Sequence, residues 1–251
     1  MKKIIMLLAA MMLVFGVSGQ AMAYFADGDL IRVVYSSSGT VESATDLGSI
    51  SAWTAPSPTN VVYNTNNFNL STLGAGANAS NSYVSYFSIM AAPNPNKAWT
   101  SGDLSGTQGI SASNWSVYVG AAHNANAQYA LSGVPTATLN MSDSNSFYAG
   151  MDASVPGSGT FHGFVPNGGG TVSLASLATT GYVDQKLYYY PGTPTRGTGT
   201  DSNILSGNIP VVRTYADGHT ELNPTVPVPA AAYLFGSGLL GLVGIRRKNA
   251  A

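Results

Sequence analysis

Short apolar runs separated by turn-forming residues constrain the fold of this chain more than any other feature of its sequence. The runs are rich in β-branched and aromatic residues, clusters of Gly, Pro, Asn and Ser bound them, and none continues into a long helical period. This pattern predicts an all-β fold, either an antiparallel sandwich or a jelly-roll-like single domain. The expected strands are residues 30–35, a second strand from position 40 that completes a hairpin, 83–89, 115–119, 136–141, 147–151, 160–164, 182–190 and 211–215.

The composition is unusually poor in charge. Only 8% of the residues are charged and 45% are hydrophobic, whereas about a quarter of the residues of an ordinary globular protein are charged. The chain has no Cys, which excludes disulfides, thiolate zinc sites and cysteine nucleophiles. Loops rich in Asn, Ser and Gly are expected at 60–81, 91–109 and 193–203, and residues 171–178 fit either a short helix or a strand.

The N-terminus is typical of a cleavable secretory signal covering residues 1–23. Two lysines precede an apolar run at 4–17. Ala21 and Ala23 supply the small residues that signal peptidase recognises, so cleavage is expected before Tyr24. The alternative is an uncleaved anchor helix, but the run is shorter than the roughly 20 residues that span a bilayer.

The C-terminus is also typical of a membrane-engaging signal and has three parts. Residues 223–229 form a Pro-punctuated tether, residues 230–245 are apolar, and the basic residues Arg246, Arg247 and Lys248 follow. An apolar helix of this length reaches about 24 Å, less than the roughly 30 Å hydrocarbon core, so it would engage a membrane only marginally. The positive-inside rule keeps the basic end cytoplasmic and places the rest of the chain outside. An amphipathic or buried core helix is the alternative interpretation.

The tail resembles the PEP-CTERM family of protein-sorting signals. It has the pattern Val-Pro-x-Pro-Ala-Ala before the apolar segment, and Val228 stands where the name-giving motif of the family has Glu. The resemblance implies processing by the membrane protease-transpeptidase exosortase, through an intermediate tethered to the inner membrane, commonly in bacteria that make exopolysaccharide. The residues that carry it are Val226, Pro227, Val228, Pro229, Ala230, Ala231, Arg246, Arg247 and Lys248.

Removal of both terminal segments would leave an acidic domain at residues 24–222. Five of the ten basic residues lie in these segments and all eleven acidic residues lie between them, so the domain carries a net charge of −6. An acidic surface without a basic patch repels phosphate backbones. Nucleic acid is therefore not an expected partner.

No sequence motif predicts catalytic residues, a cofactor or a metal. The three His residues share no spacing, and neither a zinc-protease motif nor a nucleophile elbow is present. A secreted hydrolase with two distant carboxylates remains an alternative. Two similar Asp-Gly segments suggest a calcium site built from Asp27, Asp29 and Asp217, but a pair of turns that need positive φ at Gly is the simpler interpretation.

The 14 tyrosines are the one feature that favours a carbohydrate-binding role. Strand alternation places Tyr182, Tyr188 and Tyr190 on one face of the expected strand at 182–190, together with Asp184 and Lys186. Such a ribbon could contact a glycan, whereas the simpler interpretation is that the Tyr rings cover the edge of a core. The sequence thus predicts an exported, non-enzymatic protein of the cell surface or extracellular matrix, structural or adhesive and associated with exopolysaccharide, with a carbohydrate-binding module as the alternative.

The two terminal segments make a prediction about the mass of the protein. Intact mass spectrometry of the protein recovered from the producing cells should find an N-terminus at Tyr24 and a C-terminus within residues 226–231. An exported, soluble species that ends at Ala251 would contradict the sorting interpretation.

Overall fold

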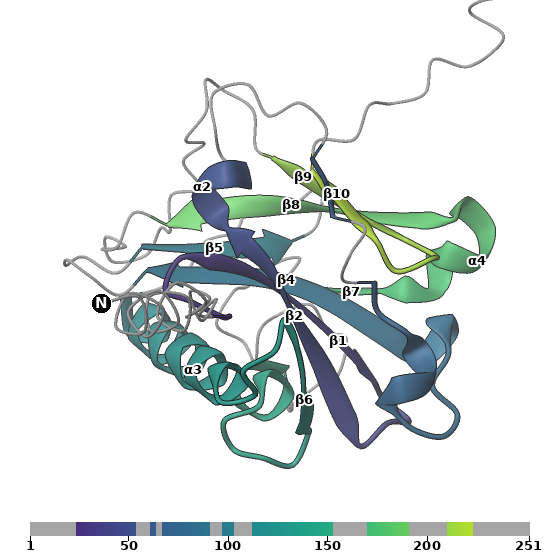
Figure 1. The fold of residues 1–251 in the computed structure, drawn as a ribbon, viewed down its shortest axis with the longest axis horizontal. Helices are drawn as coiled ribbons and strands as arrows, with labels where there is room; N and C mark the ends of the chain where they lie inside the picture. Colours follow the sequence, from purple (N-terminus) through teal and green to yellow (C-terminus); the bar gives the residue numbers. More distant parts are fainter. Residues whose placement is uncertain are drawn as a thin grey trace, which may run out of the picture.

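The computed structural model describes residues 24–53, 61–63, 67–90, 97–102, 112–152, 170–190 and 210–222 (Figure 1). These residues consist mostly of an antiparallel sheet that curls into a half-barrel. The signal segment, the tether, the C-terminal segment and the expected strand at 160–164 lie outside the described residues.

Ten strands form one sheet, in the order β3-β10-β9-β8-β5-β4-β1-β2-β6, with β7 paired to β4. Every strand pair in it is antiparallel. The strands are β1 (Asp29–Ser36), β2 (Val41–Ser49), β3 (Val61–Tyr63), β4 (Ser82–Met90), β5 (Lys97–Gly102), β6 (Thr136–Asn140), β7 (Thr171–Ser173), β8 (Tyr182–Tyr190), β9 (Val211–Tyr215) and β10 (Thr220–Leu222).

One long helix and several short ones accompany the sheet. Helix α3 (Ala112–Ala130) packs along one face of the sheet. The short elements are α2 (Ile50–Trp53), η1 (Leu70–Leu73), η2 (Ala79–Asn81), η3 (Tyr148–Asp152), η4 (Leu174–Ser176) and α4 (Leu177–Thr180).

The structure confirms most of the expected strands, including the β1–β2 hairpin, and it corrects two of them. Residues 115–119 lie within α3, and residues 147–151 fall in a helical turn that includes η3. The buried positions of α3 do recur at helical spacing, since Trp115, Tyr118, Ala122, Ala125 and Tyr129 all face the sheet. Two of these are alanines that lie among other small residues, so the helical spacing of buried positions is hard to recognise in the sequence.

Three further differences concern the expected loops and the fold class. Strand β3 lies within the expected loop at 60–81 and β5 within the one at 91–109. Residues 171–178, which fitted either a short helix or a strand, supply first a strand and then helical turns. The predicted sandwich needs two packed sheets. The described strands instead form a single sheet, and a helix covers part of one face.

Each face of the sheet carries its own hydrophobic core. Ile31, Val33 and Tyr35 of β1 point to the α3 side, and Leu30 and Val34 point to the other. This alternation continues through β4, β5 and β8, so the central strands are buried on both faces.

The side away from α3 is concave, and a buried arginine spans it. Arg32 of β1 has no exposed surface. Its Nη1 donates to the carbonyl of Gly218 at 2.7 Å and to the hydroxyl of Thr220 at 2.9 Å, and its Nη2 donates to the hydroxyl of Thr45 at 3.3 Å. Since β4, β5, β8 and β9 lie between β1 and β10 in the sheet order, these bonds require the sheet to curl.

Tyr86 of β4 joins the same cluster. Its hydroxyl lies 2.5 Å from that of Thr214 and 3.0 Å from that of Thr220. Burial raises the pKa of Tyr86 and lowers that of the Arg32 guanidinium, while the two groups favour each other's charged forms. We call Arg32, Thr45, Tyr86, Thr214 and Thr220 the Arg32 cluster.

A buried glutamate fastens β2 to the helical side. Glu42 has no exposed surface. The Tyr129 hydroxyl of α3 donates to its Oε1 at 2.5 Å, and the backbone N–H groups of Phe147 and Tyr148 donate to Oε1 and Oε2 at 2.7 Å each. Burial raises the pKa of Glu42 to about 7, although these hydrogen bonds oppose the shift.

This shift predicts how Glu42→Gln changes the dependence of stability on pH. Because the folded-state pKa is raised, the native state holds a proton that the unfolded chain releases above a pH of about 4.5. The free energy of unfolding should therefore fall between pH 4.5 and 7 by about 3 kcal/mol and level off above that range. Glu42→Gln should flatten this slope, measured by urea unfolding at several pH values.

Asp29 supplies the control, because its pKa is also raised, to about 6, mainly by burial and then by Asp46. Asp29→Asn should remove only the part of the slope below about pH 6 and keep the part that Glu42 contributes. A Glu42→Gln profile as steep as that of the unmodified protein would contradict the assignment.

Candidate functional site

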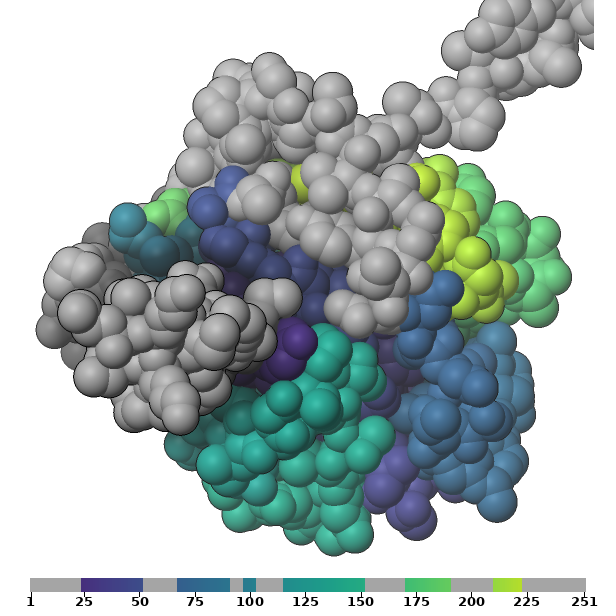
Figure 2. Space-filling view, viewed as in Figure 1, coloured from purple at the N-terminus to yellow at the C-terminus, as the bar shows by residue number. Residues whose placement is uncertain are grey.

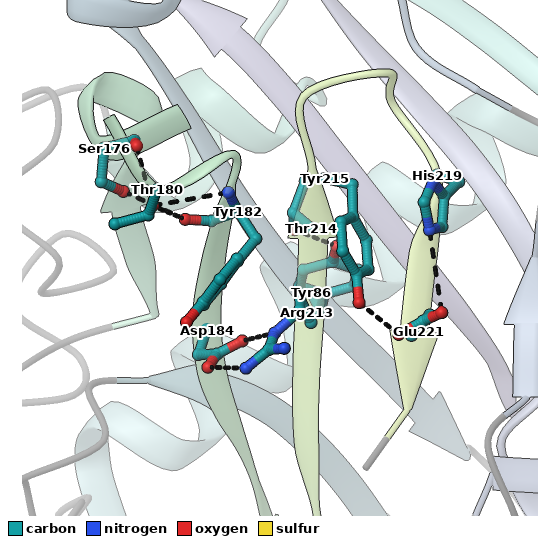
Figure 3. A network of polar contacts seen from close by, with 10 residues as sticks. All are labelled: Tyr86, Ser176, Thr180, Tyr182, Asp184, Arg213, Thr214, Tyr215, His219 and Glu221. Atoms are coloured by element: carbon teal, nitrogen blue, oxygen red, sulfur yellow. Dashed lines mark hydrogen bonds and ion pairs between the residues drawn. The ribbon is translucent and has the colours of Figure 1, made fainter. Parts of the chain in front are cut away.

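A row of aromatic and charged side chains covers the convex face of β8, β9 and β10 (Figure 3). The register pairs Tyr182 with Tyr215 and Arg213 with both Asp184 and Glu221. Their neighbours Val183, Val212 and Leu222 point into the concave core, so alternation turns the row outward. We define the outer cluster as Tyr182, Asp184, Arg213, Tyr215, His219 and Glu221.

Arg213 is fixed at the centre of this row. Its Nε and Nη2 donate to the two carboxylate oxygens of Asp184 at 2.6 and 2.7 Å. The guanidinium carbon lies 3.7 Å from the ring centroid of Tyr182 and 6.0 Å from that of Tyr215. The bidentate bond to Asp184 raises the pKa of Arg213. The cation is therefore neutralised by Asp184 and held over the ring of Tyr182.

Tyr215 and His219 form the second half of the row. Their rings stack with centroids 4.0 Å apart and an interplanar angle of 13°. The Tyr215 hydroxyl donates to Glu221, and burial together with this bond raises the pKa of Tyr215. His219 Nδ1 lies 2.5 Å from Oδ1 of Asp217, and Nε2 lies 3.9 Å from Oε1 of Glu221.

The turn between β9 and β10 sets the position of His219. Gly218 has φ +91°, and a Cβ at this residue would lie 2.5 Å from the carbonyl oxygen of Phe68, so only glycine fits. The Gly218 carbonyl accepts the hydrogen bond from Arg32 described above. Asp217 accepts from the backbone N–H and the ring of His219, and these bonds outweigh its burial and lower its pKa.

The outer cluster combines aromatic rings with charged groups that are paired with one another. Carboxylates orient the polar atoms of Arg213, Tyr215 and His219, and the ring of Tyr182 packs against the Arg213 guanidinium. The His219–Asp217 pair resembles the orienting half of a catalytic triad. Nε2 of His219, however, faces Glu221, and no hydroxyl nucleophile among the described residues contacts it. In the described part of the chain no group of three or more His, Asp or Glu could hold a metal ion.

The tyrosines predicted to contact a glycan have different positions. Tyr188 and Tyr190 are 0% and 1% exposed, respectively, and belong to the core beneath α3, where Trp115 lies 5.6 Å from Tyr190. The expected ribbon is therefore not formed, because α3 covers this end of β8. Tyr182, at the other end of the strand, is 36% exposed and does belong to the outer cluster.

Sequence reasoning missed Arg213, Tyr215, His219 and Glu221 as site residues. The alternation of Arg213 and Tyr215 within β9 was a local signal that their side chains share a face. Their position beside Tyr182 depends on the β8–β9 register, which the sequence does not reveal.

The suggested calcium ligands are not collected into one site. Asp29 accepts from the backbone N–H of Ala26 and is influenced by Asp46, whereas Asp217 is engaged with His219. Gly28 and Gly218 both have positive φ, as the turn interpretation requires. The sorting motif, Ala21 and Ala23 lie outside the described residues, and Tyr24 packs against the core on the α3 side.

Comparison with known proteins identifies no relative. No protein-family model, curated protein or solved structure matches the chain. Among the described residues no helix is both long and apolar enough to span a bilayer.

The Arg213–Asp184 contact predicts an effect on stability. The Arg213 side chain is only 8% exposed, so Asp184→Ala leaves a nearly buried guanidinium without its bidentate acceptor. We expect the free energy of unfolding to fall by about 1–3 kcal/mol. Lys186→Ala, two residues along the same face of β8, is the control and should cost less than about 0.5 kcal/mol. Equal losses in the two variants, measured by urea unfolding, would contradict this role of the contact.

Proposed function

We propose that this chain is an exported protein of the cell surface or exopolysaccharide matrix, and that the outer cluster binds a neutral saccharide without catalysis. The two terminal segments support export and sorting. The observation that carries the binding role is the exposed ring of Tyr182, packed on the guanidinium of Arg213, with Tyr215 and His219 beside it in the same row.

The chemistry of this row matches a sugar better than a charged or a purely apolar ligand. Tyrosine combines an apolar ring with a polar hydroxyl, which suits the alternating C–H faces and hydroxyl groups of a pyranose. Carboxylates and imidazole at the rim can exchange hydrogen bonds with those hydroxyls. Because Tyr182 is the most exposed large aromatic side chain of the described residues, it is the natural stacking surface.

The charge of the cluster selects against acidic polymers. Arg213 is neutralised by Asp184, which leaves Asp217 and Glu221 as the carboxylates near His219. The domain as a whole is also acidic, with a net charge of −6 between the terminal segments. A polyanion would be repelled, so a neutral, hydroxyl-rich polysaccharide is the ligand class that we propose.

The sorting tail gives this binding a location. We propose that signal peptidase removes residues 1–23 and that an exosortase-type enzyme processes the tail, so that the domain reaches the outer surface. A domain that binds the matrix polymer there would act as a structural or adhesive component.

Binding to defined polysaccharides tests the role of the outer cluster. The exported protein should be retarded in affinity electrophoresis by neutral polymers, for which dextran and hydroxyethyl cellulose are the probes, and not by polygalacturonate. Tyr182→Ala should weaken the retardation at least about tenfold, which corresponds to about 1.4 kcal/mol.

Val117→Ala is the matched control, because Val117 is 52% exposed on α3, away from the outer cluster. It should bind as the unmodified protein does. Retardation by polygalacturonate alone, or neutral binding that is indifferent to Tyr182→Ala, would rule out the proposed site.

A further inference from the structure

Strand β6 ends the sheet with an edge that no described strand covers. In the sheet order it is the last strand and pairs only with β2. In Figure 2 the teal part of the chain, which contains α3 and β6, lies at the lower left of the molecule.

The hydrogen-bond pattern shows which groups this edge presents. The backbone N–H of Asp46 donates to the carbonyl of Pro135, and the backbone N–H of Met141 donates to the carbonyl of Thr40. Because bonded residues alternate along an antiparallel ladder, the odd-numbered residues of β6 face β2. The backbone N–H and C=O groups of Thr136, Thr138 and Asn140 therefore point away from the sheet. Among the described residues, only the Asn140 carbonyl finds a backbone partner on this side, in the turn to Asp143.

This edge lacks the features that usually prevent strand addition. Exposed edges are normally protected by charged side chains, bulges or covering segments. Residues 131–142 contain no charged side chain, although the domain between the terminal segments carries a net charge of −6. The sequence of β6, Thr-Ala-Thr-Leu-Asn, is uncharged and has no proline. Two copies can therefore approach here without the repulsion that acts between their acidic surfaces.

Exposed apolar side chains lie beside the same edge. Leu131 is 78% exposed and Val134 is 47% exposed, and both belong to the turn that leads into β6. The other large exposed hydrophobics of the described residues are Val117 and Tyr182. A concentration of exposed apolar surface at an open strand edge is typical of an association site.

We propose that two copies of this chain associate through antiparallel pairing of β6 with β6. A two-fold axis at Thr138, the central residue of the strand, pairs it with its own copy, so that the two residues exchange N–H to C=O bonds. The same register places Thr136 opposite Asn140 of the second copy. Extended by two residues, it brings Val134 against position 142 of that copy, which covers this apolar side chain.

The dimer goes beyond the proposed saccharide binding and does not depend on it. Strands β6 and β10 lie near opposite ends of the sheet order (Figure 1), so pairing leaves both outer clusters open. The dimer would carry two clusters and could bridge polymer chains, which raises avidity without any new contact within a site. One strand pair buries little surface, so we expect a dissociation constant in the micromolar range.

Sedimentation velocity and cross-linking test this pairing. The exported protein should shift from monomer to dimer as its concentration rises from about 1 to 100 µM. Because the chain has no Cys, Thr138→Cys introduces a single thiol, and mild oxidation should give a disulfide-linked dimer across the axis. Ala178→Cys, on the exposed surface of α4, should stay monomeric after the same treatment.

A positive charge introduced at the proposed two-fold axis should weaken the dimer. Thr138→Lys places two ammonium groups opposite each other and should weaken dimerisation at least about tenfold, whereas Ala178→Lys should not. A protein that is monomeric at all concentrations and does not cross-link through position 138 would overturn the proposal. Dimerisation that is unchanged in Thr138→Lys would also overturn it, because another surface would then be responsible.

Discussion

The Arg32 cluster is the interaction on which the shape of the sheet depends. A guanidinium with no exposed surface is costly unless its N–H groups find acceptors. Here two of its acceptors lie far along the sheet, namely the hydroxyl of Thr220 in β10 and the carbonyl of Gly218 in the turn before it. The buried guanidinium therefore obtains these hydrogen bonds only when the sheet is curled.

This arrangement links the concave interior to the convex surface. The Gly218 carbonyl that accepts from Arg32 belongs to the turn that carries His219, and Thr214, which bonds to Tyr86 inside, lies between Arg213 and Tyr215 on β9. Because β10 has only three residues, its own ladder contributes few hydrogen bonds to hold that turn. The order of the outer cluster thus depends on polar contacts buried beneath it.

Strands and turns that depend on residues close together in the chain could be predicted from the sequence. Contacts that depend on the register between paired strands could not. The strands with strong β-branched and aromatic runs, such as β1, β4 and β8, were predictable, as was the turn between β1 and β2. Helix α3 was not, because within Trp115–Val119 a two-residue alternation is as good a description as a helical period. The outer cluster required the β8–β9 pairing, which places Asp184 beside Arg213 across 29 residues of chain.

The distribution of charge explains why one sheet can have such different surfaces. Among the few charged side chains of the described residues, four make contacts between elements of the fold: Arg32 across the concave face, Glu42 beneath α3, and Arg213 with Asp184 in the outer cluster. Each holds together elements that the short strands alone would leave weakly joined. The segment formed by β6 and the turn before it contains no charge, so the edge that ends the sheet offers another molecule its backbone groups, uncharged polar side chains and two exposed apolar side chains. Those are the groups that another uncharged strand satisfies best.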